Sequence, residues 1–76
     1  MQKLIKVLAT ALVDYPEEVE VKEIEGDKAL IVELKVADTD MGKVIGKQGK
    51  IARAIRALAK AKGNKIGKDV VVEIVS

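Results

Sequence analysis

The sequence predicts one α+β domain over residues 1–76, with the element order α-β-β-α-α-β and a three-stranded mixed sheet covered by three helices on one face. Three observations predict this class. The chain has 76 residues, which allows one small core and no second domain. Two segments carry apolar residues at helical spacing. Between them lies a run in which apolar and polar residues alternate, as in a half-buried strand.

The first helix is predicted over residues 2–14. Its apolar residues are Leu4, Ile5, Leu8, Ala11 and Leu12. Their spacing places them on one side of a helix, and Pro16 fits an end near Asp14.

A hairpin is predicted next. Its first strand lies around Val19 to Ile24, and the alternation slips after Val21, where we expect a β-bulge. A turn at residues 26–27 connects it to a second strand with strict alternation. The alternating residues are Leu30, Val32, Leu34 and Val36.

The second half of the chain is predicted to form two helices and a last strand. Asp38, Thr39 and Asp40 are candidate N-caps for a short helix over residues 40–45. The longer helix spans residues 49–62 and is expected to end at Gly63-Asn64. A basic loop over residues 65–68 leads to the last strand at residues 70–75, with Val70, Val72 and Ile74 in the core and its direction left open.

Charge is unevenly distributed along the chain. Residues 1–40 hold 5 Lys and Arg against 10 Asp and Glu, net −5, whereas residues 41–76 hold 9 against 2, net +7. A basic half is typical of a polyanion-binding surface, and a solvated face that only maintains solubility is the alternative. Cysteine and histidine are absent, which excludes disulfides, thiolate chemistry and imidazole bases. We therefore expect no catalytic residue, no metal site and no cofactor.

The N-terminus lacks the apolar segment of a signal peptide. No stretch approaches the roughly 18 apolar residues of a membrane span. The expectation is a cytoplasmic protein that does not associate with membranes.

A glycine motif lies between the two helices of the second half. Gly46 and Gly49 are three positions apart and form a GxxG turn. Glycine allows another backbone to approach closely, and Gly49 opens a helix whose first N–H groups carry partial positive charge. A phosphodiester backbone can dock at such a helix start. The candidate nucleic-acid-binding residues are Lys43, Val44, Ile45, Gly46, Lys47, Gln48, Gly49, Lys50, Ile51 and Arg53.

These side chains divide into charged and apolar groups. Lys47 projects from the turn, and Lys50 and Arg53 extend the positive field along the helix. The aliphatic residues at 44, 45 and 51 are expected to form an apolar flank on which bases rest. Gln48 could bind a phosphate or sugar, or remain a solvated turn residue. The glycines could also serve only a tight helix–helix turn.

Other phosphate-binding glycine loops fit less well. A Walker A loop needs four residues between its glycines, and here Lys50 is followed by Ile51. A dinucleotide fingerprint needs glycine at position 44, which is Val44.

The Gly46-Lys47-Gln48-Gly49 motif in this element order resembles a type II KH domain. Residues 12–19, 33–37 and 40–49 extend the similarity to the KhpA (YlqC) family of small bacterial KH proteins. The resemblance implies binding of single-stranded RNA, with the loop clamping about four nucleotides. Weak binding of single-stranded DNA is also expected. The resemblance also implies a homodimer and a heterodimer with a KhpB (Jag)-type partner. The implied role is an RNA chaperone or post-transcriptional regulator in cell division and cell-wall growth.

Two departures qualify this resemblance. Ala52 stands where many KH domains carry a bulky aliphatic residue, which predicts a shallower groove floor. Tyr15 is the one aromatic residue, so base stacking beside the loop is not expected. We therefore expect RNA binding through the backbone with low sequence selectivity. The alternative hypothesis is a protein-interaction subunit, dimeric and with little RNA binding of its own.

Overall fold

The computed structural model describes residues 2–76, with Lys47 described in its backbone only. The elements follow the predicted order, with the two middle helices joined in α2. Their bounds are α1 Gln2–Leu12, the short 3-10 helix η1 Pro16–Glu18, β1 Glu20–Glu25, β2 Ala29–Lys35, α2 Asp38–Ile66 and β3 Asp69–Val75. No helix in this described part is long and apolar enough to cross a membrane.

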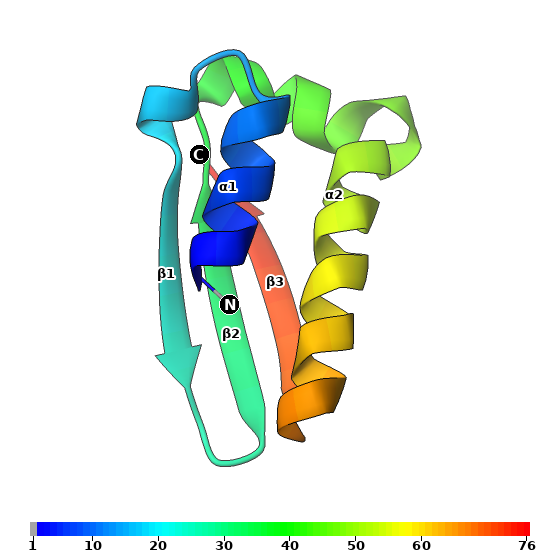
Figure 1. The fold of residues 1–76 in the computed structure, drawn as a ribbon. Coiled ribbons are helices and arrows are strands. Elements are labelled where there is room, and N and C mark those ends of the chain that lie inside the picture. The colour runs from blue at the N-terminus through cyan, green and yellow to red at the C-terminus, as the bar shows by residue number, and fades with distance from the viewer. Residues whose placement is uncertain (1) are drawn as a thin grey trace.

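The three strands form one mixed sheet in the order β1-β2-β3. The central strand β2 pairs antiparallel with β1 and parallel with β3, which settles the direction of the last strand. Figure 1 shows α1 and α2 on the same face of this sheet, as predicted. The other face carries no helix of the described chain.

The β-bulge expected in the first strand is absent. The β1–β2 register runs without interruption from Glu20 opposite Lys35 to Glu25 opposite Leu30. Ile24 pairs with Ile31 and is 50% exposed, so it lies on the face away from the helices. The slip in alternation therefore marks an apolar residue on the open face rather than a change of register.

The core lies between the sheet and the helices. Strand β2 alternates as predicted, and its buried side chains form the floor of the core. The cluster consists of Ile5, Ala9, Val19, Leu30, Val32, Leu34, Val36, Ile55, Ala59 and Val72, with Val70 and Ile74 packed against it. Burial of this apolar surface holds both helices on one face of the sheet.

Helix α2 is interrupted near its middle. Gln48 and Gly49 have φ angles of 62° and 66°, which are left-handed. Two such residues in succession cannot belong to a continuous right-handed helix. They divide α2 into a first arm, residues 38–47, and a second arm, residues 50–66. Figure 1 shows the first arm across the upper end of the sheet and the second arm running back along it.

The second arm continues past the predicted end at Gly63-Asn64. It stops at Ile66, and Gly67 is the C-cap with φ 71° and a backbone N–H that donates to the Gly63 carbonyl. The predicted basic loop at residues 65–68 therefore shrinks to residues 67–68. The reason is that Gly67, and not Gly63, adopts the left-handed conformation that ends a helix.

The start of α2 also differs from the prediction. The helix begins at Asp38, its N-cap is Ala37, and no side chain caps it. Asp40 lies inside the first turn and is completely buried. Its carboxylate is used elsewhere, because it binds the loop that follows α1.

Candidate nucleic-acid interface

The GxxG loop comprises the last two residues of the first arm, Gly46 and Lys47, and the left-handed turn at Gln48 and Gly49. A Cβ atom built on Gly46 or on Gly49 would meet nothing within 4 Å. Gly49 is favoured by its left-handed φ, whereas Gly46 has neither a left-handed φ nor a crowded neighbour. The space above Gly46 is therefore open to a group that approaches from outside.

The first arm is fixed by a buried carboxylate. Asp40 Oδ1 accepts a hydrogen bond from the Asp14 backbone N–H at 3.0 Å, and Oδ2 accepts one from the Tyr15 N–H at 3.0 Å. The Asp40 side chain is completely buried, so its charge is shielded from water and depends on these two bonds. They hold the α1–β1 connection against the start of the arm that leads to the loop.

The expected apolar flank of the loop is smaller than the sequence suggested. Val44 is 1% exposed, so its side chain supports the loop from the core and offers no surface to a base. Ile51 is half-buried and packs against the core cluster. Ile45 is 51% exposed and remains available beside the loop. Sequence spacing alone could not separate these three positions, because all are aliphatic and adjacent to the turn.

The cations near the loop lie on both arms. Lys43, one turn before Gly46, donates to Asp14 Oδ1 at 3.1 Å. Lys50 and Arg53 are exposed at the start of the second arm, and Gln48 is exposed in the turn. The side chain of Lys47 lies outside the described part of the structure. The loop thus has positive charge before and after it.

The cations of the second arm form a continuous row. Lys50, Arg53, Arg56 and Lys60 are all exposed and recur at spacings of three and four residues. Residues at these spacings lie on one side of a helix, so the row runs from the loop along the arm. We call these four residues the basic ridge. Sequence analysis singled out only the first two for nucleic-acid binding, because the outer positions of a helix are usually only solvated.

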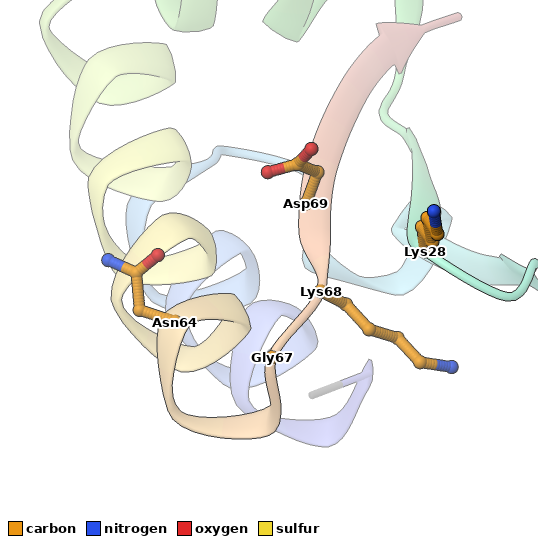
Figure 2. A pocket seen from close by; sticks show the side chains of 5 residues that line it. All are labelled: Lys28, Asn64, Gly67, Lys68 and Asp69. Atoms are coloured by element: carbon orange, nitrogen blue, oxygen red, sulfur yellow. The ribbon is translucent and has the colours of Figure 1, made fainter.

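A hollow lined by two lysines lies at the opposite end of the molecule. This surface hollow of ≈ 440 Å³ is lined by Lys28, Asn64, Gly67, Lys68 and Asp69 (Figure 2). Lys68 donates to the Glu25 carboxylate and to the Gly26 carbonyl at 3.2 Å. The hydrogen bond from Lys68, followed by its charge, lowers the pKa of Glu25 below its usual value. Because Lys68 already has these partners, the hollow is a weaker candidate for phosphate than the loop.

Comparison with known proteins identifies the family of the chain. The family model described as KhpA/KhpB, KH domain, matches residues 2–74. The chain belongs to this family. It is 60% identical over 75 residues to the RNA-binding protein KhpA of Caldanaerobacter subterraneus subsp. tengcongensis, covering 99% of this chain and 100% of that protein. It is 56% identical to the RNA-binding protein KhpA of Clostridium acetobutylicum, with the same coverage.

The KhpA/KhpB fold is also found in a larger protein of known structure. A crystal structure of Era in complex with MgGDPNP and a segment of 16S ribosomal RNA matches with a TM-score of 0.63 and 20% sequence identity. The match covers 97% of this chain and 28% of the Era chain. At this identity the likeness supports the fold alone.

Proposed function

We propose that this KhpA/KhpB-family chain binds single-stranded RNA, with low sequence selectivity, through the GxxG loop and the basic ridge. The observation that carries the proposal is the left-handed break at Gln48 and Gly49, with open space above Gly46 and exposed cations beside it. Phosphates can approach the backbone there, and the ridge supplies the charges that hold them. The names of the KhpA relatives support the same function.

The same site explains why selectivity is expected to be low. Phosphate contacts position a nucleic acid but carry no sequence information. Tyr15 is tied through its backbone N–H to Asp40, at the end of the first arm away from the loop. Among the side chains that the structure describes next to the turn, Ile45 is the one large exposed aliphatic residue. Bases therefore have few specific partners at this site.

Fluorescence anisotropy of a labelled single-stranded RNA, titrated at several salt concentrations, tests the proposal. The variant combines Lys47→Asp and Gln48→Asp. The control combines Lys28→Asp and Asn64→Asp, which makes the same charge change on exposed residues at the far end of the molecule. For about three or four phosphate contacts the wild type is expected to show a log–log salt slope of roughly −2 to −3.

We expect the loop variant to lose at least about tenfold in affinity and the control about twofold or less. Equal losses would show that RNA is held by the net charge of the protein and not by the loop. If the wild type does not bind, RNA binding by this chain is wrong, and the exposed apolar surface becomes the functional candidate.

The substitution Gly46→Ala separates the effect on RNA affinity from the effect on the free energy of unfolding. Gly46→Ala places a methyl group in the open space above the first arm, where no protein atom apart from the chain neighbours and the helix's own backbone lies within 4 Å. We expect the free energy of unfolding to rise by about 0.5–1 kcal/mol, because alanine favours a helix over glycine. RNA affinity is expected to fall by about fivefold, since the methyl group occupies the path of the phosphate backbone.

Gly42→Ala is the matched control for that experiment. Gly42 lies in the same arm, and a Cβ there also meets nothing within 4 Å. The control should gain the same stability in thermal denaturation and keep wild-type affinity in the anisotropy titration. Equal affinities for the two variants would contradict a close approach at Gly46.

A second proposed function is association with protein partners. The helices leave large apolar side chains in solvent, among them Val7 at 67% and Ile66 at 56% exposure. Exposed apolar surface on a small domain is often an interaction site. We propose a homodimer, and a heterodimer with a KhpB-type protein because the family is named jointly for both. With such a partner the chain would act in the cytoplasm as an RNA chaperone or post-transcriptional regulator in cell division and cell-wall growth.

A further inference from the structure

We infer that Asp14 competes with RNA phosphate for Lys43 and thereby sets the affinity of the loop. This inference rests on the proposed RNA-binding function. The Lys43 ammonium lies 3.1 Å from Asp14 Oδ1, and it stands one helical turn before Gly46. A phosphate at the loop must break the ion pair between Lys43 and Asp14, or bind without a contact to Lys43.

Asp14 is held in this position by the fold. Its backbone N–H donates to the buried carboxylate of Asp40, and the next N–H, of Tyr15, donates to the same carboxylate. Asp40 and Lys43 are three residues apart on the first arm, so they lie on neighbouring positions of one helix face. The arm that binds the Asp14 backbone therefore also carries the lysine that meets its side chain. The fold therefore keeps the backbone of Asp14 beside the arm that carries Lys43.

The pairing distinguishes Lys43 from the other cations of the site. Among residues whose side chains the structure describes, neither Lys50 nor Arg53 has a carboxylate within 4.0 Å. Their charges are free to attract phosphate, whereas the charge of Lys43 is paired with Asp14. The positive field is therefore weaker on the side of the first arm than on the side of the second arm.

The strength of the pair suits a competitor that RNA can displace. Both side chains are partly exposed, 47% for Lys43 and 68% for Asp14. An exposed ion pair is weak and is screened by salt. A phosphate next to Gly46 can replace it, but only at a cost in binding free energy. Removing the carboxylate should therefore strengthen RNA binding.

The test is a set of RNA anisotropy titrations at low salt. Asp14→Asn removes the negative charge and keeps the backbone N–H that binds Asp40. Asp27→Asn, in the exposed β1–β2 turn at the other end of the molecule, makes the same charge change as a control. Lys43→Met, alone and combined with Asp14→Asn, completes a double-mutant cycle. Thermal denaturation verifies that each variant is folded.

We expect Asp14→Asn to tighten RNA binding by about two- to fivefold and Asp27→Asn to change it less than about twofold. In the Lys43→Met background most of the gain from Asp14→Asn should disappear. A weaker or unchanged affinity of Asp14→Asn would overturn the inference, as would a gain that persists in full without Lys43. The proposed function fails separately, if wild-type protein does not bind or the GxxG loop variant binds equally well.

Discussion

Gly63→Ala is expected to lower the free energy of unfolding by about 2–3 kcal/mol. A Cβ atom at this buried position would lie 2.5 Å from Val70 Cγ2 and 2.7 Å from the Lys68 carbonyl oxygen. The carbonyl belongs to the backbone, so it cannot move aside as a side chain could. The second arm of α2 must shift away from β3, and urea denaturation will measure the cost. For a domain of this size the melting temperature should fall by about 10–20 °C.

Two comparisons make this prediction specific. Gly42→Ala is the same substitution in the same helix without a close neighbour, and it should stabilise the protein. Adding Val70→Ala to Gly63→Ala removes one of the two clashes, so the double variant should be more stable than the sum of the two single effects predicts. Additive losses would show that the valine is not the group that the new methyl meets. A Gly63→Ala protein as stable as wild type would contradict the close packing of arm and strand.

The behaviour of Gly63 illustrates what the sequence could not decide about the fold. Glycine after a helical pattern predicts a C-cap, but it also permits close packing inside a helix, and only the position of β3 distinguishes the two. Strand β2 was predictable because a strict alternation of apolar and polar residues indicates a half-buried strand and no other element. The parallel direction of β3 was not predictable, because the pattern of side chains along a strand is the same whichever way the strand runs. Ile24 led to the wrong prediction of a β-bulge, because the sequence does not show whether an isoleucine is buried or exposed.

The position of the turn in the candidate site was predictable from the sequence. Two glycines three apart within a basic half indicated the loop, and the structure places a left-handed break there. The continuation of the basic ridge to Lys60 follows from helix geometry once the second arm is known to be unbroken. The Lys43–Asp14 pair could not be foreseen, because it joins residues 29 positions apart through a loop whose path depends on Asp40.

Asp40→Ala is the second substitution for which we expect a large loss, of about 2–4 kcal/mol in the free energy of unfolding. It removes the acceptor of two backbone N–H groups, at Asp14 and Tyr15. Both N–H groups then lose their hydrogen-bond partner, and a cavity remains where the carboxylate was. Asp40→Asn keeps one acceptor oxygen of nearly the same shape and should lose about half as much. Urea denaturation of the three proteins at neutral pH measures this order.

Asp38→Ala is the control, because Asp38 is an exposed acidic residue in the same helical turn. It should cost less than about 1 kcal/mol, the usual size of a helix-dipole effect. Amide hydrogen exchange gives a local reading, since the Asp14 and Tyr15 N–H groups should exchange faster in Asp40→Ala than in Asp38→Ala. Equal stability and equal exchange in these two variants would show that the buried carboxylate does not hold the α1–β1 connection. The fixed position of Asp14 beside Lys43 would then lose its structural basis, whatever the RNA titrations show.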